Sequence, residues 1–498
     1  MSKVVKKNNL KVNIIFNAAY QVIILIIPFI TSPYLSRVLT ASGIGSYSYA
    51  FSIVNYFITT ANFGFLAYGT VLIAKVRDNK EDYSQTFWNL FFTKLILLLL
   101  NLFAFYILVA TNVFELSSYP LNTQHVYLIL SLFIIGQGLD MTFFFQGLEQ
   151  FTSLCVRNFC IKVLNLILIM LFVKSSSDYR NYVIIMSSTF LLAPLVMYPK
   201  IVKNISKPKW NDIHIFTHIK QSFAYFLPNV FTIIYTTISK TFVGRIINDS
   251  EASGYLENAT KLINLVTVVV NSVNVVMMSR ISFLYKQENK GAIASLIDKV
   301  FELYIIISIP AFAGLMAVNG NFTPAFFGQE YAESVNLIYI LAPTILFSSL
   351  SDIIESVYYI PSNHIWKRTL FLGIGALVNI VSSYLLIKFI GIEGAAISTV
   401  VTQFLIMVLY IVFCKKEVSF KAMATPGIQA FDASLIMVIA IYFINLLFSG
   451  KISGLVLSLI QIFAGVVVYG LLLILFKEKL IIRVLDQTLK KLKTIFHK

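Results

Sequence analysis

Long apolar stretches recur along almost the whole chain, and they constrain the fold more than any other feature. A transmembrane helix needs about 20 mostly apolar residues. Stretches of this kind occur at 12–33, 45–73, 87–111, 124–147, 154–173, 180–199, 222–246, 259–283, 300–318, 334–360, 368–389, 393–413, 431–449 and 452–476. Only 12% of the 498 residues are charged, too few to form a water-soluble shell around so much apolar surface. The sequence therefore predicts an all-α integral membrane protein of about fourteen helices.

Lysine and arginine are distributed unevenly among the gaps between these stretches. If the chain starts in the cytoplasm and crosses fourteen times, thirty of the 39 basic residues fall in cytoplasmic segments and seven in outward ones. The positive-inside rule associates such an excess with the cytoplasmic side of a membrane. Both termini are therefore predicted to be cytoplasmic. The formal net charge of +16 is explained by topology, and no nucleic-acid partner is expected.

Two distant segments of the chain repeat each other. Residues 36–47 have the sequence SRVLTASGIGSY and residues 244–255 have the sequence GRIINDSEASGY, so that Arg37 aligns with Arg245. Each segment follows a proline-containing helix that is predicted to start in the cytoplasm, which makes the repeat parallel. The repeat predicts two parallel six-helix lobes around a central cavity, followed by a C-terminal helix pair.

The predicted organisation divides the chain into six parts. They are a cytoplasmic N-tail (1–11), an N-lobe (12–200), a basic cytoplasmic linker (201–221), a C-lobe (222–413), helices thirteen and fourteen (431–476) and a basic, amphipathic cytoplasmic tail (477–498). The tail has apolar residues at helical spacing and lysines on the other face, a pattern typical of helices that lie on an anionic membrane surface.

Basic residues inside or beside the predicted spans are candidates for binding a substrate headgroup. A charged side chain is expensive in lipid, so it should face a wet cavity or a partner. The candidates found in this way are Lys94, Arg157, Lys162, Lys240, Arg245 and Arg280. If they face inward, they form a cationic cavity suited to a phosphate or pyrophosphate group, which Arg contacts bidentately and Lys as a point charge. The alternative is that the long side chains extend to the membrane interface.

Acidic residues in the spans are candidates for ion or proton coupling. Asp140 belongs to the fourth predicted span, Asp352 and Glu355 belong to the tenth, and Glu149 follows the fourth. Taking up a proton or a cation would change the cost of burying such a carboxylate. The alternative is a salt bridge to Lys94 or Lys162 that only stabilises the helix bundle.

The sequence contains no recognisable catalytic or nucleotide-binding motif. No P-loop, nucleophile elbow or zinc-protease motif occurs, and the longest predicted outward loops are near 112–123 and 319–333. Neither an enzyme activity nor a metal or cofactor is therefore expected. Energy for transport would come from a proton or sodium gradient, the membrane potential or the substrate gradient.

Four stretches resemble motifs of a known transporter family. They are TFFFQGLE at 142–149 after Asp140, PFITSPYLSRVLTASGIGSYSY at 28–49, SFAYFLPNVFTIIYTTISKTFVGR at 222–245 and MMSRI at 277–281. Together they resemble the bacterial polysaccharide flippases, also called the Wzx-type or oligosaccharide flippase family. This family belongs to the superfamily that includes the MATE exporters and the lipid II flippase. The resemblance covers most of residues 10–415.

The resemblance implies a flippase with two six-helix lobes in the bacterial cytoplasmic membrane. Its cargo would be an undecaprenyl-pyrophosphate-linked oligosaccharide for capsule, exopolysaccharide or O-unit assembly, and its partners the lipid bilayer and polymerase or glycan-assembly proteins. The basic cavity of the family carries over to Arg37, Lys240, Arg245 and Arg280, and we expect Arg37 and Arg245 to contact the headgroup phosphates. The chain departs from the family at Ser239, where many members have an acid, which puts acid-based coupling in the seventh helix in doubt.

Three further functions compete with this one. A teichoic acid precursor flippase would carry the same lipid pyrophosphate, so a basic cavity does not separate the two cargoes. A MATE-like exporter of small cations predicts an acidic, apolar cavity instead. A polytopic glycan polymerase or ligase usually has a large outer loop with catalytic Arg or His, which the predicted topology lacks.

Overall fold

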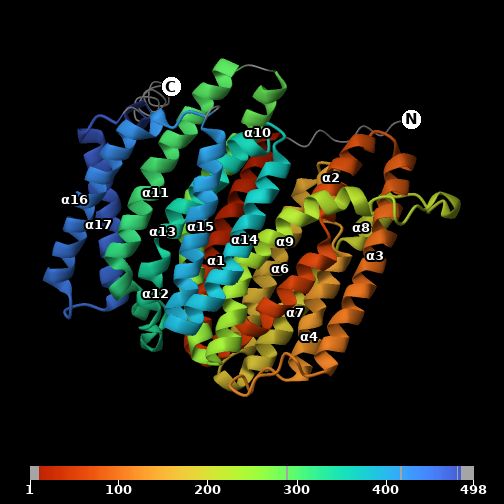
Figure 1. Ribbon diagram of the computed structural model, residues 1–498, viewed down its shortest axis with the longest axis horizontal. Coiled ribbons are helices and arrows are strands. Elements are labelled where there is room, and N and C mark those ends of the chain that lie inside the picture. The colour runs from red at the N-terminus through yellow and green to blue at the C-terminus, as the bar shows by residue number, and fades with distance from the viewer. Residues whose placement is uncertain (1–9, 288–289, 416–417, 479, 484–498) are drawn as a thin grey trace. The chain divides into compact units, whose positions relative to one another are not determined.

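The computed structural model describes residues 10–287, 290–415, 418–478 and 480–483, although some side chains inside these ranges, such as those of 273–280, are not described. The described residues form helices and no strand (Figure 1). In chain order the helices are α1 (Leu10–Asn62), α2 (Phe65–Val76), α3 (Lys80–Ala110), α4 (Gln124–Leu139), α5 (Thr142–Gly147), α6 (Phe151–Phe172), α7 (Tyr179–Leu195), α8 (Tyr198–Asn204), α9 (Ile219–Phe242), α10 (Ser250–Lys286), α11 (Lys290–Phe327), α12 (Ser334–Leu341), α13 (Pro343–Ile354), α14 (Ile365–Ile390), α15 (Ile392–Cys414), α16 (Ala424–Phe448) and α17 (Gly454–Leu475). Two π-helical turns, Val243–Ile247 and Glu355–Tyr359, follow α9 and α13.

The predicted class, an all-α membrane protein, is confirmed, whereas the count of fourteen spans is not. Among the described residues, 11 helical segments are long and apolar enough to cross a membrane, or 12 if the bent pair Ser334–Leu341 and Pro343–Tyr359 is one span. One reason for the difference is that α1 contains two helices that meet at a kink at Thr40, where φ is 63°, and the first two predicted spans are counted there as one segment. The predicted tails lie largely outside the described residues.

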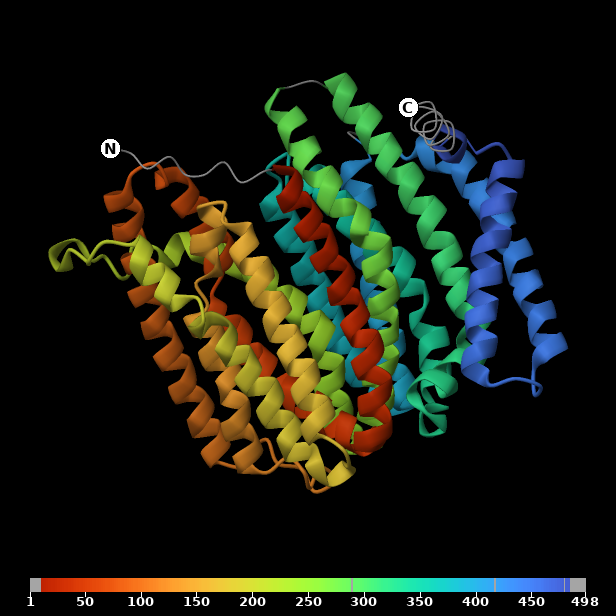
Figure 2. The ribbon, with the colours of Figure 1, turned by 180° about the vertical axis from the view of Figure 1, so that it is seen from behind.

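Packing divides the chain into two compact units, one up to Gly254 and the other from Tyr255 onward. In the first unit, α4 lies beside α1, α3 and α7, and α6 lies beside α7 (Figure 2). The predicted lobes and the linker at 201–221 remain predictions.

The first unit has two apolar cores that hold these helices in register. One core joins α1, α3, α4 and α7 through rings such as those of Tyr47, Phe105 and Phe133. The other core contains Phe143 and Phe144 of the TFFFQGLE motif, both fully buried between α2, α3 and α5. Gly69 of α2 leaves room for the Phe143 ring, because a Cβ on Gly69 would lie only 2.8 Å from the nearest atoms of Phe143. The motif therefore fixes the short helix α5 directly after α4.

The two repeat segments pack against each other in the first unit. The hydroxyls of Ser42 and Ser250 are 2.8 Å apart, and these two residues occupy equivalent positions, 208 residues apart, in the repeat. A side chain on Gly45 would overlap the carbonyl oxygen of Ser250, and a side chain on Gly254 would overlap that of Ala41. Both glycines are therefore required by the close approach of the two backbones, which holds the start of α10 against α1.

Candidate functional site

The polar centre of the first unit forms where α4 ends. Asp140, the first residue after α4, has an extended backbone, and its Oδ1 accepts hydrogen bonds from the Thr142 amide (3.1 Å) and the Thr142 hydroxyl (2.6 Å). This local pattern is the way in which Asp commonly ends a helix and starts a turn. The carboxylate is thereby fixed toward the neighbouring helix α6.

Two basic side chains converge on this acid. Arg157 of α6 places Nη1 3.5 Å from Asp140 Oδ1, with 9% of its side chain and 25% of that of Asp140 exposed. Its Nη1 also donates to the Thr142 hydroxyl at 3.3 Å, and its Nε donates to Asn158 at 2.9 Å. Lys94 of α3 is fully buried and donates to the backbone oxygen of Asp140 at 2.5 Å. The alternative considered for the acids in the spans, a salt bridge to Lys94 or Lys162, does not hold for Asp140, because its ion pair is with Arg157.

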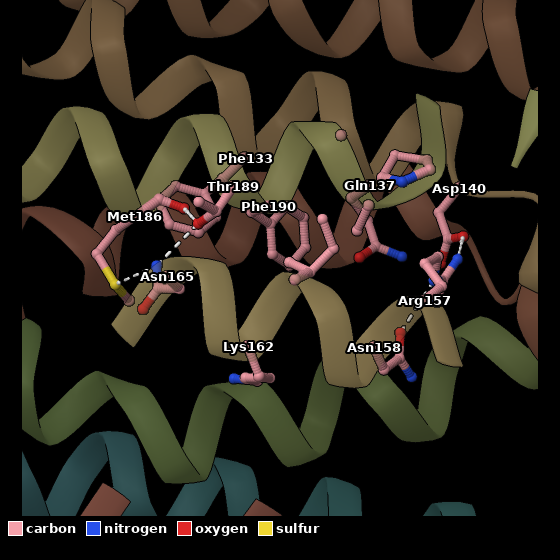
Figure 3. A pocket seen from close by; sticks show the side chains of 14 residues that line it. Phe133, Gln137, Asp140, Arg157, Asn158, Lys162, Asn165, Met186, Thr189 and Phe190 are labelled. Atoms are coloured by element: carbon pink, nitrogen blue, oxygen red, sulfur yellow. Dashed lines mark hydrogen bonds and ion pairs between the residues drawn. The ribbon is translucent and has the colours of Figure 1, made fainter. Parts of the chain in front are cut away.

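A cavity of about 330 Å³ extends from this ion pair between α4, α6 and α7 (Figure 3). It is lined by Phe133, Gly136, Gln137, Asp140, Arg157, Asn158, Ile161, Lys162, Asn165, Met186, Thr189, Phe190, Ala193 and Pro194. At the end away from Arg157, the amide of Asn165 donates to the Thr189 hydroxyl at 2.8 Å. A largely apolar cavity with a few placed polar groups is the usual form of a small-molecule binding site.

The structure brings only some of the predicted basic residues to this cavity. Arg157 and the exposed Lys162 line it, and Lys94 lies behind the Asp140 backbone. Arg37 is exposed on α1, and Lys240 is half-buried on α9. The side chain of Arg280 in α10 lies outside the described part of the structure.

Arg245 belongs to a different set of contacts. It lies in the π-helical turn after α9, and its exposed guanidinium donates to the backbone oxygen of Val113 in the loop after α3. Nearby, the Ser118 hydroxyl donates to the Asn248 oxygen, and the Tyr119 hydroxyl contacts the Asp249 oxygen and the Ser253 hydroxyl at 2.8 and 2.7 Å. These bonds join the loop 111–123 to the turn before α10.

The other acidic candidates lie in separate places. Glu149 is exposed, with φ of 57°, and forms an ion pair with the exposed Arg77. In the second unit, Asp352 accepts a hydrogen bond from the Asn271 amide at 2.6 Å. Glu355, which starts the second π-helical turn, lies 2.7 Å from Nε of Arg368.

Sequence reasoning missed several polar residues of these sites. It did not single out Arg368, the first residue of the predicted span 368–389, which lies in α14 and pairs with Glu355. It also missed Asn158 and Asn165, which line the cavity together with Arg157 and Lys162. These four residues of α6 recur at helical spacing, so a search for polar residues on one face of an apolar helix could have found them.

The sequence and the fold are similar to those of known transporters. A model of the family described as "Polysaccharide biosynthesis protein" matches residues 10–283. The "Putative O-antigen transporter" of Escherichia coli strain K12 is 24% identical over 417 residues, which are 82% of this chain and 98% of that protein.

Two solved structures share the fold over most of their length. The lipid II flippase MurJ in an inward closed conformation superimposes with a TM-score of 0.73 and 14% identity, over 94% of this chain and 99% of that one. An inward-facing multidrug resistance MATE transporter superimposes with a TM-score of 0.59 and 12% identity, over 83% of this chain and 96% of that one. At these identities the likeness establishes the fold.

Proposed function

Because its family model matches more than half of the residues, the chain belongs to the polysaccharide biosynthesis protein family, and we propose that it is a flippase for a lipid-linked glycan. The proposed cargo is an undecaprenyl-pyrophosphate-linked repeat unit, which moves across the bacterial cytoplasmic membrane for capsule, exopolysaccharide or O-unit assembly. Alternating exposure of the cargo to the two membrane sides would move it, without an enzymatic step. The name and the extensive alignment of the E. coli relative support this cargo class.

The observation that carries the proposal is the excess of positive charge inside apolar helices. Lys94 and Arg157 are at least nine-tenths buried, and both lie beside the single acid Asp140. An uncompensated cation is costly in a low-dielectric interior, and an anionic cargo group would offset that cost. The headgroup of an anionic lipid-linked glycan supplies such an anion, whereas the cationic cargo of a MATE-like exporter would add to the excess.

Energy for the transport is proposed to come from a proton or sodium gradient acting through Asp352. The Glu355 carboxylate forms an ion pair with Arg368, whereas the Asp352 carboxylate accepts a hydrogen bond from the side-chain amide of Asn271. A proton or Na⁺ could therefore be taken up at Asp352 without breaking an ion pair. A flipping rate that stays unchanged when proton and sodium gradients are imposed would contradict this part of the proposal.

The phosphate-binding role of Arg37 and Arg245 can be tested in cells that depend on this chain for glycan export. Replacing either arginine by alanine removes charge-assisted hydrogen bonds to the pyrophosphate, and each such bond contributes enough for a roughly 10- to 100-fold effect. We expect Arg37→Ala and Arg245→Ala each to reduce surface glycan by at least about tenfold while membrane levels of the protein are retained. Surface glycan is measured by lectin or antibody binding, and protein level by immunoblot.

Two controls make this test specific. Arg180→Ala removes another exposed arginine, at the start of α7, and should leave export at the wild-type level. Arg245→Lys keeps the charge but alters the contact to Val113, so it separates charge from local structure. Wild-type export by both alanine variants would overturn the assignment of these arginines.

A further inference from the structure

The cavity beside Arg157 has polar groups at both of its ends and an aromatic ring between them. Asp140, Arg157 and Gln137 lie at one end and Asn165 at the other, with the ring of Phe190 between the two ends (Figure 3). The register of the helices agrees with this order, because successive turns of α6 contribute Arg157, Ile161 and Asn165. The cavity therefore has hydrogen-bonding side chains at its two ends and an apolar face, the Phe190 ring, between them.

Phe190 can occupy this position because the facing residue of α4 is a glycine. A Cβ on Gly136 would lie 2.9 Å from Cδ1 of Phe190, closer than carbon atoms pack. Phe190 in turn packs against Phe133, with ring centroids 5.0 Å apart and the ring planes tilted by 49°. An apolar face beside amide and carboxylate groups matches a sugar ring, which has apolar C–H faces and a rim of hydroxyl groups.

The charges of the cavity determine which kind of sugar it suits. Arg157 and Lys162 line the cavity together with one acid, Asp140. The guanidinium of Arg157 uses only Nη1 and Nε in its bonds to Asp140, Thr142 and Asn158. Its other amino group, Nη2, is left for an anionic ligand. With about 330 Å³ the cavity lies near the lower end of the range of roughly 300–1,000 Å³ for small-molecule sites. This volume suits one sugar unit rather than a whole repeat unit.

We propose that this cavity is a subsite for one anionic sugar, carrying a carboxylate or a phosphate, in the headgroup of the cargo. The proposal rests on the proposed flippase function and adds the chemistry of the headgroup to it. Arg157 binds the acidic substituent while Asn165 and Gln137 bind hydroxyl groups, and Phe190 packs against the ring. The ion pair with Asp140 keeps Arg157 in place when the subsite is empty.

The direct test is binding of soluble sugars to the purified full chain in lipid nanodiscs, measured by saturation-transfer NMR. The probes are D-glucuronate, α-D-glucose 1-phosphate, D-glucose and inorganic phosphate. We expect glucuronate or glucose 1-phosphate to bind roughly 10- to 100-fold more tightly than glucose, because only they form charge-assisted bonds with Arg157. Equal affinity for glucose, or inorganic phosphate binding as tightly as the sugar phosphate, would overturn the proposal.

Variants locate the binding within the cavity. Arg157→Gln should abolish the preference for the charged sugars, and Asn165→Ala should weaken all sugars by roughly tenfold. Arg180→Gln, which removes an exposed arginine at the start of α7, should change nothing. A thermal unfolding curve for each variant shows whether it is folded, and Arg157→Lys serves as a second variant if Arg157→Gln is not. Wild-type affinities in the folded Arg157 and Asn165 variants would contradict the subsite.

A flipping assay separates failure of this inference from failure of the proposed function. If wild-type protein does not move a lipid-linked glycan in vesicles, the proposed function fails whatever the sugars do. If wild-type protein moves it, and the Arg157 and Asn165 variants both bind sugars and transport like wild type, only the subsite fails.

Discussion

Two glycines decide how closely the repeat segments approach each other. Gly45 and Gly254 each face a backbone carbonyl of the opposite segment, and no side chain fits at either position. Small residues have this role in membrane proteins because helices in lipid associate through close packing and hydrogen bonds rather than through a hydrophobic driving force. The same close approach of the two segments allows the hydroxyls of Ser42 and Ser250 to contact each other.

Alanine at Gly45 is predicted to destabilise the first unit. Its Cβ would overlap the Ser250 carbonyl, so the two segments would have to move apart, and overpacking of this kind typically costs about 1–3 kcal/mol. We expect Gly45→Ala to lower the thermal unfolding midpoint of the purified protein. Gly470→Ala is the matched control in α17, because no atom lies within 4 Å of the added Cβ. Identical midpoints for Gly45→Ala and wild type would show that the two repeat segments are not closely packed at this glycine.

At the scale of elements, hydrogen bonds connect the loop 111–123 to the turn before α10 on the side that topology predicts to face outward. We call this connection the latch and predict that it holds that side closed. Arg245, Ser118 and Tyr119 make the bonds that connect them. The turn follows a π-helical segment, a local irregularity that often marks functional positions in helices. If the lobes alternate their exposure, this latch is one of the structures that must open.

Removing the Tyr119 hydroxyl should favour opening of the latch. Tyr119→Phe loses the bonds to Asp249 and Ser253. A cysteine that replaces Ser42, which contacts Ser250 beside this turn, should then be more accessible and react faster with a membrane-impermeant maleimide. The experiment uses a background in which Cys155, Cys160 and Cys414 have been replaced. Tyr127→Phe is the control, because that hydroxyl donates its hydrogen bond to Phe114 within the same loop rather than to the turn. An unchanged labelling rate in Tyr119→Phe would contradict a latch function.

The elements themselves were largely predictable from sequence, whereas the partners of the charged residues were not. Apolar runs of membrane length are a local property, so the helical class followed from them directly. The pairing of Asp140 with Arg157 depends on the rotation of α6 about its axis, which the low amphipathicity of an apolar helix does not specify. Arg368 was missed for a related reason, because its position near a helix end was consistent with a loop.

The candidate site was predictable in part. Sequence reasoning identified Lys94, Asp140, Arg157 and Lys162 individually as unusual in lipid, and the structure brings them together. It expected Glu149 to act in coupling, and the structure places that residue in an exposed ion pair with Arg77. Apolar cavity residues such as Phe190 gave no signal, since an aromatic residue in a membrane span is ordinary.

At the scale of the whole molecule, the charge pattern predicts an orientation in the membrane, and hydropathy identifies helices that can span it. The excess of Lys and Arg in alternate gaps predicts cytoplasmic termini, and many described helices are long and apolar enough to span a membrane. The family match places the chain among the polysaccharide biosynthesis proteins, and its fold is shared with a solved structure over most of both chains. The account therefore depends on net movement of an anionic, lipid-linked glycan through this chain.

That movement can be measured with purified protein in vesicles. A lipid-linked oligosaccharide with a pyrophosphate is incorporated on one side, and its arrival on the other is followed with an impermeant glycosidase, with and without an ion gradient. The account predicts transfer well above that of protein-free vesicles for wild type and Arg180→Ala, and loss of this transfer in Arg37→Ala and Arg245→Ala. Transfer by wild type no faster than in protein-free vesicles, under every gradient, would contradict it.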